Sequence, residues 1–154
     1  MSNIQKNLER FKITIPEPPN PVGNYSAYTI SQKKIYISGQ LPIKENGEII
    51  KGKIGENLTI AEGKEATKIA ILNTIGHLKR ATGDLNKVKK CLKINGFINC
   101  TSSFHDHPAL LNIASNIIIN IFGEKGKHAR AVIGVSSLPF NSAVEIETIF
   151  EIDV

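Results

Sequence analysis

The stretch HARAVIGVSSLP, residues 128–139, has the composition of a buried strand with a fixed positive charge at its entrance. Small and branched apolar residues follow from Ala131 to Val135, which favours a strand. Arg130 stands at their head, and a buried guanidinium is costly unless an anionic group pairs with it. We therefore expect Arg130 to meet either a carboxylate of the protein or the carboxylate of a ligand.

A second strand follows at Val144–Ile152, where VEIETIFEI alternates strictly between apolar or neutral residues and mostly acidic ones. The two strands are expected to be neighbours, so Arg130 and Glu147 are candidates for interaction. A structural ion pair is one interpretation. The other is that Arg130 binds a ligand carboxylate while Glu147 acts as an acid or base, as in a site for a small oxoacid or imino acid.

Two helices precede these strands. Thr59 and Glu62 form a capping box, apolar residues recur at helical spacing up to Leu78, and Gly83 ends the helix. A second apolar stripe runs through residues 110–122, and Gly123 ends it. Asp106 or His107 should cap this helix, with Pro108 in its first turn.

The remaining pattern predicts one domain over residues 1–154, whose first 23 residues form a short helix and an extended, proline-rich arm. Strands are expected near residues 28–30, 35–38 and 88–99, with a turn at Asn46-Gly47. The order of elements indicates an α+β fold with a mixed sheet and two helices on one face. The opposite face carries apolar residues as well as charges, so other subunits should cover it.

Composition excludes several classes of protein. The chain is 41% hydrophobic and 21% charged, and no apolar run reaches the roughly 20 residues that span a bilayer. We expect no membrane contact, and a cytoplasmic location because residues 1–13 lack a secretory pattern. Cys91 and Cys100 do not have CxxC spacing and should be free, buried thiols. The net charge of +5 is spread along the chain, so we expect no nucleic-acid partner.

Cofactor motifs are also missing from the sequence. His105 and His107 lie close together in HDHP, but no third ligand follows at a spacing typical of metal sites. The segment FGEKGKHAR does not match a phosphate-binding loop, and no GxGxxG follows a strand. We expect neither a metal nor any other cofactor.

Four segments together resemble, in the same order, signature segments of the Rid family of reactive intermediate deaminases, also called YjgF-like proteins. They are GNYSAY, IYISGQLPI, HARAVIGVSSLP and VEIETIFEI. The resemblance extends from Tyr25 to the C-terminus and is closest to a longer subgroup of the family. It implies a chorismate-mutase-like fold, assembled as a homotrimer with the sheets facing inward and with sites in the clefts between subunits.

The resemblance also implies an activity. The family archetype hydrolyses enamine and imine intermediates, such as 2-aminoacrylate, to 2-oxoacids and ammonia without a cofactor. A small imino, enamino or oxo acid is therefore the expected partner. Two alternatives are a non-catalytic protein that binds or senses 2-oxoacids, and an endoribonuclease or translation inhibitor, activities attributed to some members.

Residues can be matched to the family pattern one by one. Arg130 corresponds to the arginine that binds the substrate carboxylate, and Glu147 to the glutamate that positions or activates water. The positions expected to line the substrate site are Tyr25, Ser38, Gly39 and an asparagine of the second helix, Asn112 or Asn116. Val132 stands where the archetype often has a cysteine, so no thiol is available there.

Overall fold

The computed structural model describes residues 1–153, which form three α-helices and one five-stranded sheet. The helices are α1 (Asn3–Arg10), α2 (Ile60–Thr82) and α3 (His107–Phe122). The strands are β1 (Tyr28–Ser31), β2 (Lys34–Gln40), β3 (Val88–Asn99), β4 (Ala129–Val135) and β5 (Val144–Ile152). The sheet order is β1-β2-β5-β3-β4, with only the β3–β4 pair parallel. This confirms the α+β class.

Both long helices begin and end close to the predicted residues. Thr59 and Glu62 form the capping box of α2, and Gly83 ends that helix in the left-handed conformation that glycine adopts without steric cost. Helix α3 starts at His107 with Pro108 in its first turn and ends at Gly123. Asp106 occupies the N-cap position of α3, as one of the two predicted residues, although its side chain makes no capping hydrogen bond.

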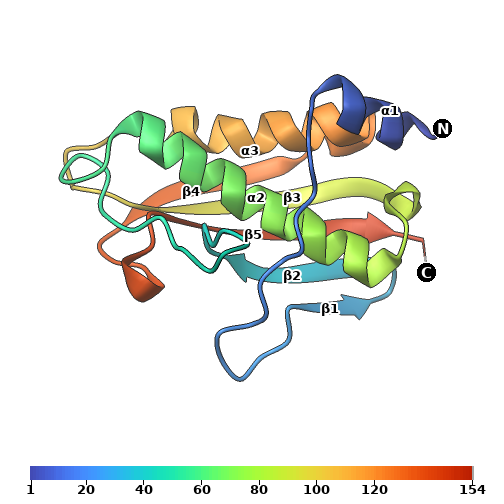
Figure 1. Cartoon of the computed structure of the whole chain (residues 1–154), viewed down its shortest axis with the longest axis horizontal. Helices are drawn as coiled ribbons and strands as arrows, with labels where there is room; N and C mark the ends of the chain where they lie inside the picture. The colour runs from blue at the N-terminus through green and yellow to red at the C-terminus, as the bar shows by residue number, and fades with distance from the viewer. Residues whose placement is uncertain (154) are drawn as a thin grey trace.

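Helices α2 and α3 lie side by side on one face of the sheet (Figure 1). The strict alternation in β5 explains this arrangement. The side chains that face the helices are all buried, namely Val144, Ile146, Thr148, Phe150 and Ile152, whereas the residues between them are exposed or half-buried. Ile35 and Ile94 from neighbouring strands and Ile71 from α2 are fully buried in the same core. No helix within residues 1–153 combines the length and apolarity needed to cross a membrane.

The strand order corrects one expectation. Strands β4 and β5 follow each other in the chain, but β3 lies between them in the sheet. The reason is topological: β4 runs parallel to β3, so it must be reached through a crossover, and α3 provides it. Strand β5 then pairs antiparallel with both β3 and β2. Arg130 and Glu147 are therefore not on adjacent strands.

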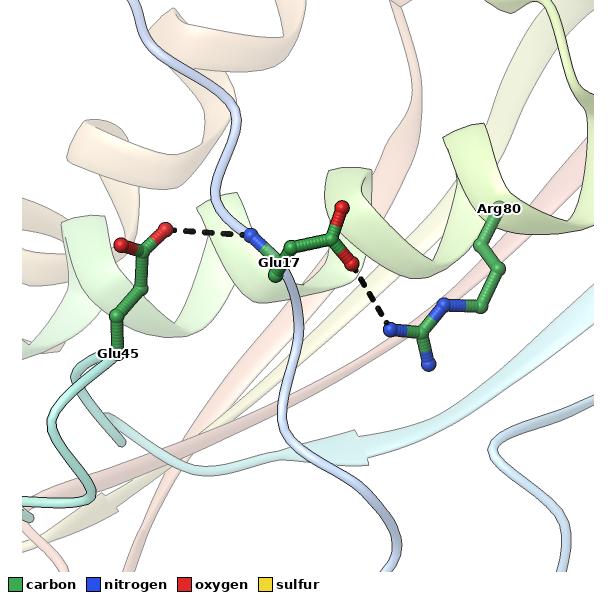
Figure 2. Close-up of polar contacts among 3 residues, drawn as sticks. All are labelled: Glu17, Glu45 and Arg80. Carbon is green, nitrogen blue, oxygen red and sulfur yellow. Dashed lines mark hydrogen bonds and ion pairs between the residues drawn. The ribbon is translucent and has the colours of Figure 1, made fainter.

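The N-terminal arm crosses the outer surface of α2 (Figure 1). A Cβ at Gly76 would lie 2.8 Å from the carbonyl oxygen of Pro16, so this close approach requires glycine. Figure 2 shows how Glu17 fixes the arm on both sides: its backbone N–H donates to Glu45 Oε1 at 3.2 Å, and its carboxylate accepts from Arg80 at 3.1 Å. The arm thus leads the chain to the loop that carries Tyr25.

Candidate active site

Arg130 lies near the start of the edge strand β4, half-buried, with its side chain on the sheet face that carries α3. Its Nη1 donates a hydrogen bond to Ser115 Oγ on α3 at 3.0 Å. Within residues 1–153, no carboxylate lies within 4.0 Å of a nitrogen of this guanidinium. The protein's own ion pair with Glu147 is therefore not formed, and the planar fork of donors is left for another acceptor.

Ser115 connects Arg130 to His128. His128 Nε2 lies 2.8 Å from Ser115 Oγ, and its Nδ1 lies 2.6 Å from the carbonyl oxygen of Gly126. A carbonyl can only accept, so Nδ1 must carry the proton and Nε2 of a neutral ring accepts from the serine hydroxyl. Ser115 Oγ then accepts from Arg130. This assignment gives an unbroken chain of hydrogen bonds that fixes the guanidinium against α3.

A second group of predicted residues lies around the end of β2. Ser38 Oγ donates to the backbone carbonyl of Ser26 at 2.7 Å, and the Ser38 amide donates to Ala27 at 2.9 Å. These bonds hold the loop that carries Tyr25, which is half-exposed, beside Gly39. The structure therefore brings Tyr25, Ser38 and Gly39 together as expected.

Glu145 on β5 also belongs to this second group. A Cβ at position 39 would collide with the Glu145 carboxylate, so only glycine allows that side chain to lie across the strand. Burial raises the pKa of Glu145 above its usual range, and the negative charge of Glu147 raises it further. A partly buried carboxyl with a raised pKa is suited to acid or base chemistry.

Glu147 occupies a different environment. Its side chain is exposed on the open face of the sheet, and Asn95 Nδ2 of β3 donates to its Oε1 at 3.0 Å. Alternation places Glu145 and Glu147 on this open face, whereas Arg130 faces α3. Within one described protomer, the Arg130 group and the Gly39 group are therefore on opposite faces of the sheet.

Neither predicted asparagine of α3 contacts Arg130 in the described structure. Asn112 and Asn116 are both exposed, and Ser115 is the buried polar residue of this helix that reaches the guanidinium. The sequence contained a signal for this, since Ser115 interrupts an otherwise apolar buried stripe of α3. Val132 follows Arg130 on the same side of β4 and packs near Gly96.

His128 and Glu145 also carried signals that pattern reading could have used. His128 precedes Arg130 by two positions, so an extended chain directs both side chains to the same face. Glu145 precedes Glu147 by two positions on β5 and shares its face for the same reason. The sequence pattern does not distinguish the two glutamates. The tertiary structure does, because it places the Glu145 carboxylate against Gly39.

His77 of α2 lies beneath the Gly39 group. The imidazole is buried, and its Nδ1 has no hydrogen-bond partner in the described structure. It lines a cavity of about 20 Å³ with Tyr25 and Gly39, large enough for one water molecule. Burial lowers the pKa of His77, and the charge of Arg80 lowers it further. No group of three potential metal ligands occurs within residues 1–153.

Comparison with known proteins supplies the wider context. Residues 7–152 match the family model described as "YjgF/chorismate mutase-like, putative endoribonuclease". Protein TCP17 of Trypanosoma cruzi is 37% identical over 151 residues, which cover 97% of this chain and 94% of that protein. The 2-iminobutanoate/2-iminopropanoate deaminase of Dermatophagoides farinae is 30% identical over 142 residues, covering 92% and 95% of the two chains.

The fold has close structural counterparts as well. The crystal structure of Atu1372 from Agrobacterium tumefaciens superposes with a TM-score of 0.88 at 38% identity, covering 97% of this chain and 94% of that one. The arrangement of helices and sheet described above is thus shared along nearly the full length of both chains.

Proposed function

Because this chain belongs to the YjgF/chorismate mutase-like family, we propose that it hydrolyses reactive 2-imino acids and their enamine forms, such as 2-aminoacrylate. The products are a 2-oxoacid and ammonia. Support comes from the deaminase relative, which aligns over more than nine-tenths of both chains. We propose that the reaction takes place in the cytoplasm and uses no cofactor.

The observation that carries this proposal is the unpaired guanidinium of Arg130. It is held by Ser115, stands half-buried at the sheet edge, and has no carboxylate partner within residues 1–153. A planar carboxylate that accepts two parallel hydrogen bonds is the ligand this fork fits best. All 2-imino acids and 2-oxoacids carry such a group next to the reacting carbon.

The chemistry that remains is modest. Water adds to the electrophilic imine carbon to give a carbinolamine. The hydroxyl proton of the carbinolamine then passes to the nitrogen, the carbon–nitrogen bond breaks as the carbonyl forms, and ammonia leaves. Orientation of the substrate and of one water molecule supplies most of what this reaction requires. We assign the orientation of water to Glu145 in place of Glu147, because Glu145 is the half-buried carboxylate that lies against Gly39.

The two halves of this site must come from different protomers. Arg130 and Glu145 lie on opposite faces of one sheet, so a second copy of the chain has to bring a Gly39 group to each Arg130 group. We propose a homotrimer with the open sheet faces turned inward. In support, that face exposes large apolar side chains, including 42% of Tyr36 and 52% of Ile133.

A protein that only senses 2-oxoacids is the second candidate, because one protomer by itself carries the carboxylate anchor without Glu145 beside it. Cleavage of RNA is less well supported than either of these two functions. The chain has only six Phe and three Tyr residues, which offers few stacking positions for bases.

The proposal predicts that the protein accelerates 2-oxoacid release from 2-aminoacrylate generated in situ by a pyridoxal-phosphate lyase. Product is measured by reduction with lactate dehydrogenase, against a blank without the protein. A rate equal to the blank would contradict the deaminase. Calorimetric titration with 2-oxobutyrate then separates the remaining cases: binding that is lost in Arg130→Ala would indicate a sensor, and absence of binding would contradict the carboxylate anchor as well.

A further inference from the structure

A second cluster of reactive side chains lies at the opposite end of β4 from Arg130. Cys100, which follows β3, places its Sγ 3.6 Å from Nε2 of His107, the first residue of α3. The ring of His107 packs against Phe104, with ring centroids 5.2 Å apart. The thiol and the imidazole are thus held in hydrogen-bonding contact by two separate elements.

These groups line a cavity of about 480 Å³, which is within the size range of small-molecule sites. Gly134 of β4 forms part of its wall, and a Cβ there would lie 2.7 Å from both Cys100 Sγ and His107 Nε2. Only glycine therefore leaves room for the pair to meet and face the cavity. Arg130, Glu145 and Tyr25 do not line this space, so it is separate from the proposed deaminase site.

Lys53 brings a positive charge to the same cavity. Its Nζ donates to the backbone carbonyl of Ser136 at 2.6 Å, which fixes the ammonium at the cavity wall. Burial raises the pKa of the Cys100 thiol, and the charge of Lys53 partly offsets this. Cys100 is therefore a protonated thiol at neutral pH, and it needs a base to become a nucleophile.

We propose that this cavity binds small α,β-unsaturated carbonyl compounds and that Cys100 adds covalently to them. The sulfur forms a bond to the β carbon while the carbon–carbon π bond breaks and its electrons move toward the carbonyl oxygen. His107 Nε2 accepts the thiol proton and returns it to the α carbon. The ammonium of Lys53 stabilises the negative charge that develops on the carbonyl oxygen.

The chain contains its own reference thiol for testing this proposal. Cys91 is fully buried in the core, and burial raises its pKa to about 12. Folded protein is treated with acrylamide, and modification of each cysteine is followed by peptide mass spectrometry. We expect Cys100 to react at least about tenfold faster than Cys91, because only Cys100 has an adjacent base and a cavity. Equal rates in the folded protein would overturn the proposal.

Two variants test the assigned roles. His107→Gln should slow modification of Cys100 at least about tenfold, since general bases typically contribute a hundredfold or more. Lys53→Met should also slow it, whereas Lys51→Met, an exposed lysine outside the cavity, serves as the matched control and should not. Wild-type reactivity in His107→Gln would overturn the role of the imidazole.

In each variant the reactivity of Cys91 reports unfolding. A negative result for Cys100 would not contradict the proposed deaminase activity, because that activity is tested by 2-oxoacid release and by variants of other residues.

Discussion

Replacing Arg130 with alanine should lower kcat/KM for 2-aminoacrylate by about thirtyfold or more. The substitution removes the group that we propose binds the substrate carboxylate, and losing a charge-assisted, partly buried hydrogen-bonded partner costs about 2–5 kcal/mol. Each 1.4 kcal/mol corresponds to about a factor of ten. The defect should fall mainly on KM, since carboxylate binding is present in the ground state and the transition state alike.

Two further variants frame this result. Arg130→Lys keeps the charge but not the planar fork, so it should retain an intermediate activity. Lys127→Ala removes a nearby exposed charge that is paired with Glu124, and it should retain wild-type activity. Steady-state assays on all three, with circular dichroism to verify folding, decide the matter. Full activity in Arg130→Ala would contradict the proposal that Arg130 binds the substrate carboxylate.

Glu145→Gln should lower kcat by about a hundredfold, while Glu147→Gln should stay within about twofold of wild type. The reason is position. Glu145 is half-buried and lies across Gly39, whereas Glu147 is exposed and accepts a hydrogen bond from Asn95. The isosteric amide keeps the shape of each side chain and removes only its charge. The reverse order of effects would return the role in water activation to Glu147.

The pH profile provides a second readout of the same carboxyl. If ionised Glu145 orients water, activity falls as pH decreases through its pKa, which burial and the charge of Glu147 hold above the usual glutamate range. The acidic limb of kcat should therefore lie above that range. Glu147→Gln removes a negative neighbour, which lowers the pKa of Glu145 and shifts the limb to lower pH. An unchanged limb in that variant would contradict the electrostatic coupling.

The raised pKa also fixes the expected effect on stability. Between its unfolded and folded pKa values, the folded state binds more protons through Glu145 than the unfolded state does, so stability decreases as pH rises through that window. At neutral pH the ionised carboxylate thus opposes folding. Glu145→Gln should unfold at the same urea concentration as wild type or a higher one, so lost activity in this variant cannot be attributed to unfolding.

Much of the fold was predictable because local rules and tertiary packing agree. The capping box at Thr59, the left-handed stop at Gly83 and the alternation in β5 all have local physical causes. The order of the strands in the sheet has no such local cause. Strand β5 inserts between β2 and β3, a choice made by long-range pairing, and it separated Arg130 from Glu147 where adjacency was expected.

Arg130 and the group of Tyr25, Ser38 and Gly39 were predictable from the sequence, whereas the polar partners of Arg130 and the choice between Glu145 and Glu147 were not. Arg130 stood out because its charge conflicts with an apolar strand, and Ser38 and Gly39 stood out through a family resemblance. The partners of Arg130 were missed, since Ser115 and His128 reach it from different elements. A contact across α3 and β4 depends on helix register, which the loop before α3 leaves undefined in the sequence.

We propose that Arg130 of one protomer and Glu145 of another form one site. This proposal is tested most directly by co-expressing differently tagged Arg130→Ala and Glu145→Gln chains and assaying oxoacid release by the purified mixed assembly. In a cyclic trimer carrying both chains, about one site in three combines an intact Arg130 with an intact Glu145. We predict that the mixed assembly recovers a corresponding fraction of wild-type activity. Activity no higher than that of either variant alone would contradict the shared site.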